Sequence, residues 1–102
     1  MRIVKRRTLR DYGRKYPDAA DWLAEWEDIV GAADWQSIMD ARSVYLHADA
    51  VLVKSGNQVT AFNVRGNRYR LIVSIKYQWG MVYVLRFLTH SEYSANRWKA
   101  QL

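Results

Sequence analysis

Cysteine is absent from the 102 residues, which excludes disulfide bonds, thiolate metal ligands and a cysteine nucleophile. No run of about 18 apolar residues occurs, so the sequence predicts no membrane-spanning helix. The first residues also lack an apolar stretch of the length that a signal peptide needs. The two histidines are far apart and have no carboxylate cluster nearby, so they do not indicate a metal site. We therefore expect a cytoplasmic protein that uses neither a metal nor a cofactor.

The composition is that of a folded protein. Half of the residues are hydrophobic and 14% are aromatic, which argues against disorder. A chain of this length is sufficient for one hydrophobic core and too short for two. No repeat or low-complexity linker interrupts it. We expect a single domain over residues 1–102.

Charge is strongly segregated along the chain. Residues 1–16 carry seven Lys or Arg and one acid, residues 17–50 eight acids and one Arg, and residues 51–102 eight Lys or Arg and one Glu. Such segregation favours a basic working surface for a polyanion, with the acidic segment placed elsewhere. A purely solubilising role for the basic residues is the alternative.

Hydrophobic spacing predicts helices in the first half. Thr8 and Asp11 have the spacing of a capping box, which predicts a helix from Thr8 to about Tyr16. Apolar residues then recur at helical spacing over 19–33, with Trp22 and Trp26 on the buried side. A shorter helix is expected over 37–45.

After Asp49 the hydrophobic period changes to that of strands. Gly66-Asn67 is typical of a two-residue hairpin turn, and residues 78–80 suggest a three-residue turn. The predicted strands are 2–5, 51–53, 58–65, 68–77 and 81–89, and a short helical tail follows around 91–98. The fold class is therefore α+β, with the N-terminal helices packed on one face of an antiparallel meander.

The two turns fix which strand residues share a face. Asn63 should lie opposite Arg70, Ile72 opposite Arg86, and Arg68 level with His90, because directly opposed side chains point the same way. The predicted polar face contains Asn63, Arg65, Arg68, Arg70, Ser74, Lys76, Arg86 and His90. Some apolar residues share it, namely Ala61, Ile72, Val84 and Leu88. The predicted core face contains Phe62, Val64, Tyr69, Leu71, Val73, Ile75, Tyr83, Leu85 and Phe87.

Two segments resemble the HigB-type toxins of the RelE-like superfamily. They are Phe62-Asn63-Val64-Arg65-Gly66-Asn67-Arg68-Tyr69-Arg70-Leu71 and Arg86-Phe87-Leu88-Thr89-His90-Ser91-Glu92-Tyr93. The resemblance implies a RelE-like fold and an endoribonuclease that cuts mRNA on the translating ribosome. It also implies inhibition by a helix-turn-helix antitoxin of the HigA-like kind. Catalytic residues vary within that superfamily, so the fold does not assign the roles.

Metal-free cleavage of RNA requires a base for the 2′-hydroxyl, a cation for the phosphate and an acid for the leaving 5′-oxygen. His90 is the candidate acid or base because imidazole titrates near neutrality. Arg70 and Arg68 are candidates for holding the scissile phosphate. Tyr93, one turn after His90, could supply a hydroxyl or a stacking surface. The candidates for binding the remaining RNA are Asn63, Arg65, Asn67, Lys76 and Arg86.

Several alternatives remain at this point. His90 and Tyr93 could be structural, Arg86 could pair with Glu92, and His47 is expected in a loop without a chemical role. A non-catalytic RNA-binding module could also use the same basic sheet surface. In that case, substitution of His90 would have little effect, and substitution of Arg68 or Arg70 would weaken binding in a salt-dependent way.

Overall fold

The computed structural model describes residues 1–102 as helices packed against a five-stranded sheet. The helices are α1 (Arg6–Lys15), α2 (Ala20–Ala32), α3 (Ile38–Val44) and α4 (His90–Ser94). The strands are β1 (Arg2–Val4), β2 (Asp49–Leu52), β3 (Gln58–Val64), β4 (Tyr69–Lys76) and β5 (Met81–Thr89). Short 3₁₀ segments are η1 (Pro17–Ala19), η2 (Tyr77–Trp79) and η3 (Arg97–Gln101). The predicted α+β class is confirmed, and no helix is long and apolar enough to cross a bilayer.

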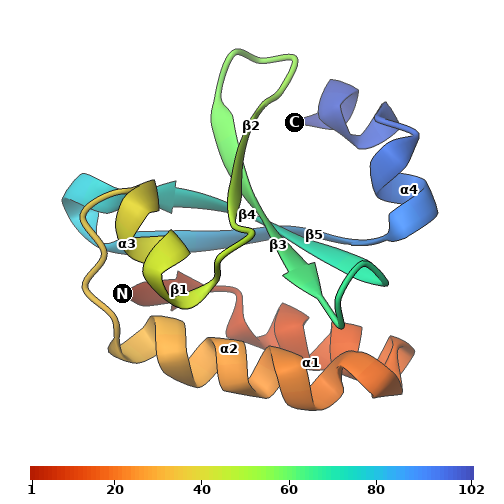
Figure 1. Cartoon of the computed structure of the whole chain (residues 1–102), viewed down its shortest axis with the longest axis horizontal. Coiled ribbons are helices and arrows are strands. Elements are labelled where there is room, and N and C mark those ends of the chain that lie inside the picture. Colours follow the sequence, from red (N-terminus) through yellow and green to blue (C-terminus); the bar gives the residue numbers. More distant parts are fainter.

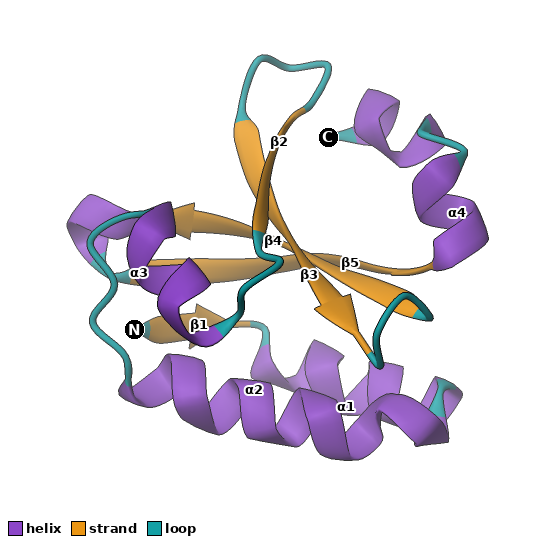
Figure 2. Ribbon diagram, in the orientation of Figure 1, coloured by secondary structure: helices purple, strands orange, loops and turns teal.

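The strand order is β1-β5-β4-β3-β2. Strands β2 to β5 form the predicted antiparallel meander, and β1 adds to its edge in parallel with β5. Helices α1 and α2 lie side by side beneath one face of this sheet (Figure 1). The β2–β3 hairpin rises from the opposite side toward α4 and the C-terminus (Figure 2). The Lys54 N–H at the hairpin donates to the Lys99 carbonyl of η3 at 3.1 Å, which joins these two segments.

The main core lies between the two long helices and the sheet. Trp26, Phe62, Leu71 and Val73 are fully buried there, and Trp26 and Phe62 meet edge-on with ring centroids 5.6 Å apart. The prediction that Trp26 lies on the buried side of α2 is thus confirmed. A second, smaller cluster lies on the other face of the sheet, where α4 and η3 cover it. It contains Val53, Val59, Ala61, Ile72, Leu88 and Trp98.

Strand register agrees with the prediction around Asn63 and Arg70 and differs near the turn between β4 and β5. Asn63 lies opposite Arg70 and Ile72 opposite Arg86, as predicted. The β4–β5 connection runs over four residues, from Tyr77 to Gly80, instead of three. A β-bulge after the Ile72–Arg86 pair absorbs this difference.

Because of the bulge, the core residues of β5 differ from the predicted ones. Val82 and Val84 are buried in the main core, whereas Tyr83 lies opposite Ser74 and Leu85 packs on the second cluster. The prediction that Tyr83 and Leu85 face the helices, and that Val84 shares the polar face, is therefore wrong. Because the turn is one residue longer than predicted, each side chain of β5 between the turn and the bulge points to the opposite face of the sheet. The other predicted core residues, Phe62, Val64, Tyr69, Leu71, Val73, Ile75 and Phe87, contact the main core.

The predicted capping box at Thr8 is also wrong. Helix α1 already begins at Arg6, and the Thr8 N–H donates to the Lys5 carbonyl at 3.0 Å within its first turn. A capping box forms instead at the start of α4. There the Glu92 N–H donates to Thr89 Oγ1 at 3.2 Å, and the Thr89 N–H donates to Glu92 Oε1 at 2.9 Å. This arrangement fixes where β5 ends and α4 begins.

Candidate active site

A polar hollow opens on the sheet face that α1 and α2 do not cover. We call it the Arg70 hollow. Its volume is about 400 Å³, and α3, the following turn, three strands and α4 all contribute to it. The lining residues are Arg42, Leu46, His47, Ala48, Asp49, Ala61, Asn63, Arg70 and Tyr93. It lies beside the second apolar cluster, whose Ala61 is shared with it.

Arg70 provides a buried positive charge to this hollow. The residue is 9% exposed and is the one charged residue among the buried set. Its Nη1 donates to the Tyr69 carbonyl at 3.2 Å and its Nη2 to Asn67 Oδ1 at 3.0 Å. A guanidinium has five N–H donors, so three are left without a protein acceptor. No ion pair of the structure includes Arg70. A buried, uncompensated cation is costly unless an anion occupies its surroundings.

Tyr93 lies against this guanidinium. The Arg70 Cζ atom is 5.1 Å from the ring centroid of Tyr93, which also stacks on Trp98 at 5.4 Å. Trp98 Nε1 donates to the Tyr93 carbonyl at 3.1 Å, which helps hold α4 and η3 together. Burial raises the pKa of the Tyr93 hydroxyl, and the Asp49 carboxylate adds to this effect while Arg70 opposes it. The hydroxyl is therefore protonated at neutral pH and can act as a donor.

The turn between α3 and β2 brings three further polar side chains to the hollow. Arg42 Nε donates to the Ala48 carbonyl at 2.8 Å, and the Ala48 N–H donates to the Tyr45 carbonyl at 2.9 Å. Ala48 itself is buried in the main core at 3% exposure. His47 and Asp49, on either side of this anchored residue, are exposed and line the hollow.

Arg68 was expected on the same face as Arg70, and the structure places its guanidinium elsewhere. Its Nη1 donates to Asp18 Oδ2 at 2.7 Å, and the Tyr69 hydroxyl donates to the other oxygen of that carboxylate at 2.8 Å. Because Asp18 belongs to η1 and Tyr69 to the main core, Arg68 is directed toward the helical layer. The prediction that Arg68 shares a face with Arg70 is therefore wrong. Arg68 lies in a turn of four residues, and its guanidinium pairs with the carboxylate of Asp18, 50 positions earlier in the chain.

His90 is exposed at the first position of α4 and does not line the hollow. Its backbone N–H donates to the Arg68 carbonyl at 3.0 Å, which ties the end of β5 to the β3–β4 turn. Tyr93, three residues later on the same helix, does line the hollow.

The predicted RNA-binding residues are distributed over a wider area. Asn63 lines the hollow, and Asn67 binds Arg70 directly. Arg65 is exposed in the β3–β4 turn, while Lys76 is exposed at the far end of β4. Arg86 Nη1 donates to the Leu85 carbonyl at 2.8 Å, and it does not pair with Glu92, whose carboxylate caps α4. The structure therefore gathers Asn63, Asn67, Arg70 and Tyr93, and leaves the others outside.

Arg42, His47 and Asp49 line the hollow although the sequence does not indicate them as site residues. The predicted first strand of this hairpin begins at Val51, two residues later than β2, so the sequence places His47 in a loop without a role. No signal in the hydrophobic pattern marks these three residues, because they reach the hollow only through the pairing of β2 with β3. No group of three or more His, Asp or Glu side chains lies close enough together to hold a metal ion.

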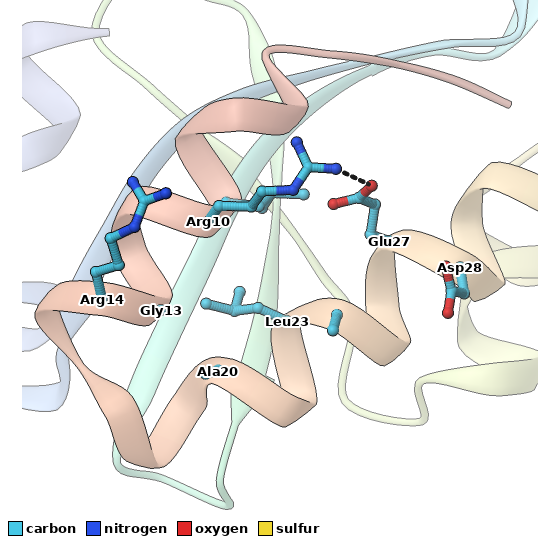
Figure 3. A pocket seen from close by; sticks show the side chains of 9 residues that line it. Arg10, Gly13, Arg14, Ala20, Leu23, Glu27 and Asp28 are labelled. Carbon is cyan, nitrogen blue, oxygen red and sulfur yellow. Dashed lines mark hydrogen bonds and ion pairs between the residues drawn. The ribbon is translucent and has the colours of Figure 1, made fainter.

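A second concave region lies between α1 and α2 (Figure 3). It has a volume of about 450 Å³, an apolar floor that includes Leu9 and Leu23, and charged rims. Its cations already have partners. Arg10 lies 3.4 Å from the Glu27 carboxylate, as the dashed line in Figure 3 marks, and Arg14 lies 2.8 Å from Asp11. This groove therefore offers no unpaired charge comparable to Arg70.

Comparison with known families adds a decisive observation. Residues 19–96 match the HigB_toxin family, described as the RelE-like toxic component of a toxin-antitoxin system. This match spans α2 to α4 and includes every residue of the Arg70 hollow. The chain belongs to the HigB toxin family. A comparison with curated proteins gives no match. The resemblance seen in the sequence is confirmed, and membership of this family implies an antitoxin as partner.

Proposed function

We propose that this HigB-family toxin is an mRNA endoribonuclease that acts on the translating ribosome, with the Arg70 hollow as its active site. The observation that carries the proposal is the buried Arg70 guanidinium, which has no carboxylate partner and three free donors. Family membership supports ribonuclease activity in general terms. The hollow adds a specific place for the scissile phosphate.

Arg70 is proposed to bind the scissile phosphate. A guanidinium fits two phosphate oxygens at once, and its donors are held in place by Asn67 and the Tyr69 carbonyl. As the 2′-hydroxyl attacks, negative charge grows on the phosphate oxygens, so these contacts strengthen toward the transition state. A preorganised donor of this kind contributes about 10²- to 10³-fold to a rate.

The remaining predicted residues are proposed to act at different distances from this phosphate, and Arg68 is no longer proposed to bind it because its guanidinium pairs with Asp18. Tyr93 offers a protonated hydroxyl beside Arg70, and Asn63 lies on the neighbouring strand. His90 is proposed as an acid–base group that acts on the leaving 5′-oxygen from the start of α4. Arg65, Lys76 and Arg86 are proposed to bind RNA at a distance from the scissile bond, and Arg68 contributes charge at the β3–β4 turn.

The reaction that fits these groups uses the RNA's own 2′-hydroxyl as nucleophile. It therefore requires no cofactor and no metal, because side chains can carry both protons. The hollow is small and presents few groups that could read base edges. We propose that the ribosome supplies most of the positioning of the mRNA, and that a HigA-like antitoxin neutralises the toxin.

Analysis of the product ends tests this function. Purified toxin is added to ribosomes that carry a defined mRNA, and the fragments are examined for a 2′,3′-cyclic phosphate and a 5′-hydroxyl. Both ends are expected. Fragments that carry 3′-hydroxyl and 5′-phosphate ends would contradict attack by the 2′-hydroxyl. Tight ribosome binding without any cut would favour the non-catalytic RNA-binding module instead.

A further inference from the structure

His47 occupies an anchored position at the mouth of the Arg70 hollow. The turn that carries it is fixed on one side by the Arg42 Nε bond to the Ala48 carbonyl at 2.8 Å. On the other side, the Ala48 N–H bonds to the Tyr45 carbonyl at 2.9 Å, and the Ala48 side chain is buried. The backbone of His47 is therefore held, while its imidazole is exposed in the hollow and makes no hydrogen bond of its own.

The hollow brings this imidazole together with the proposed phosphate-binding arginine. Asp49 lies opposite Ala61, and Asn63 lies opposite Arg70. His47 lies two residues before Asp49, in the turn that leads into β2, and it lines the same hollow as Asn63 and Arg70. Two strand spacings separate the backbones of β2 and β4 by roughly 10 Å. Side chains that converge from both sides over this span can contact one phosphodiester together.

The other charged groups that face this imidazole come from every element around it. Arg42 belongs to α3, Asp49 to β2, Arg70 to β4 and Tyr93 to α4, and β3 contributes the uncharged Asn63. Arginine stays protonated, and the Tyr93 hydroxyl is protonated at neutral pH because burial raises its pKa. A carboxylate is generally a weaker base than an imidazole. His47 is the only imidazole among the lining residues, and histidine is the side chain that most often serves as a general base.

We propose that His47 is the general base of RNA cleavage in the Arg70 hollow, an inference that rests on the proposed function. The neutral imidazole takes the proton of the 2′-hydroxyl as its oxygen forms a bond to phosphorus. The bond from phosphorus to the 5′-oxygen breaks, and a 2′,3′-cyclic phosphate remains on one fragment. The departing 5′-oxygen takes a proton from His90, the acid–base group of the proposed function. The exchanged protons return through solvent after the fragments separate.

Single-turnover cleavage on mRNA-programmed ribosomes over pH 5.5 to 8.5 tests the inference. His47→Gln keeps a polar side chain but cannot titrate, and Lys54→Gln, at the exposed tip of the β2–β3 hairpin, is the matched control outside the hollow. Loss of a general base predicts cleavage about 10²- to 10⁴-fold slower for His47→Gln. Its rate should no longer fall as pH decreases through the imidazole range. Lys54→Gln should behave as wild type, and all three proteins should bind ribosomes equally.

Chemical rescue separates a proton-transfer role from a structural one. His47→Ala should regain cleavage when free imidazole is added, in proportion to the fraction of neutral imidazole. If wild type cuts the mRNA and His47→Gln cuts at the same rate with the same pH profile, the inference is wrong while the proposed function stands. A slower variant with an unchanged pH profile and no rescue would also overturn it, because a folding defect gives that result. If wild type makes no cut, the proposed function itself fails.

Discussion

Arginine side chains on the two sides of the sheet differ in their partners. On the side of the α1–α2 layer, guanidinium groups meet carboxylates, as in the Arg6–Glu27 contact between the two helices at 3.0 Å and the Arg68–Asp18 contact at 2.7 Å. On the other face, Arg70 is far more buried than Arg68 and has no acidic partner. Arg68 and Arg70 are two residues apart, yet the charge of Arg68 is paired with Asp18 and the charge of Arg70 has no acidic partner.

Under the proposed function, this difference separates a region that stabilises the fold from a region that binds RNA. Paired surface charges contribute little to the stability of the fold, and they need no ligand to neutralise them. A buried cation with free donors is unfavourable for folding, so it is retained where something else benefits from it. The helix-covered face holds most of the apolar core, whereas the Arg70 hollow collects His47, Asp49, Asn63 and Tyr93 around that cation. Substitutions should separate these two regions.

The largest effect on stability is expected on the helix-covered face. Leu23 of α2 is 2% exposed in the main core, so Leu23→Ala should lower the free energy of unfolding by about 2–5 kcal/mol. Leu46→Ala makes the same chemical change at the hollow, where Leu46 is 77% exposed, and should change that free energy by less than about 0.5 kcal/mol. Urea denaturation of the two variants measures the contrast. Equal losses would show that the hollow is as tightly packed as the core.

An intermediate effect is expected at Tyr93, which belongs to the hollow. Its hydroxyl donates no hydrogen bond within the protein, so Tyr93→Phe should leave the free energy of unfolding within about 1 kcal/mol of wild type. Its pKa is raised by burial, so the difference in absorbance titration between wild type and Tyr93→Phe should have its midpoint above 10. Because the folded pKa is the higher one, the stabilisation linked to this group is complete below pH 10 and is lost as pH rises through the folded value. A midpoint at or below 10 would mean that burial of the hydroxyl does not outweigh the Arg70 charge, which lowers this pKa.

The smallest effect is expected at Asp18, on the paired side. Hydrogen bonds from Arg68 and from the Tyr69 hydroxyl lower the pKa of this carboxyl below 3.8. Its contribution to stability is therefore complete above pH 3.8 and is lost as pH falls through the lower, folded value. Asp18→Asn should flatten that acid portion of the stability profile and leave cleavage unchanged. An Asp18→Asn variant that cuts mRNA more slowly would tie Arg68 to the active site after all.

The local sequence pattern was sufficient to predict much of this architecture. The Gly66-Asn67 turn gave the correct register for Asn63 and Arg70, because the side-chain alternation on both strands admits only that pairing. The Ile72–Arg86 pair was also correct, although the turn that suggested it was one residue too short. The β-bulge that reconciles the two leaves no distinct mark in the hydrophobic pattern, so Tyr83, Val84 and Leu85 were misplaced.

The composition of the hollow was less predictable because it depends on contacts between distant segments. The direction of the Arg68 side chain is set by Asp18, 50 residues earlier, and no local pattern encodes that pair. His47 follows a short helix in a turn, and it reaches the hollow only because β2 pairs with β3 from Asp49 onward. Arg70 and Tyr93 were predicted because they lie on a strand and on the helix directly after its neighbour, where register alone brings them to one face.

The most direct test of the account compares Arg70→Gln with Arg68→Gln. Both substitutions remove one positive charge from the same hairpin, at Arg70 an unpaired one in the hollow and at Arg68 one paired with Asp18. Single-turnover cleavage of mRNA on ribosomes should fall by about 10²- to 10³-fold for Arg70→Gln and by less than about twofold for Arg68→Gln, with ribosome binding retained in both. Equal losses in the two variants, matched by weaker binding, would show that general positive charge rather than the Arg70 hollow underlies the activity.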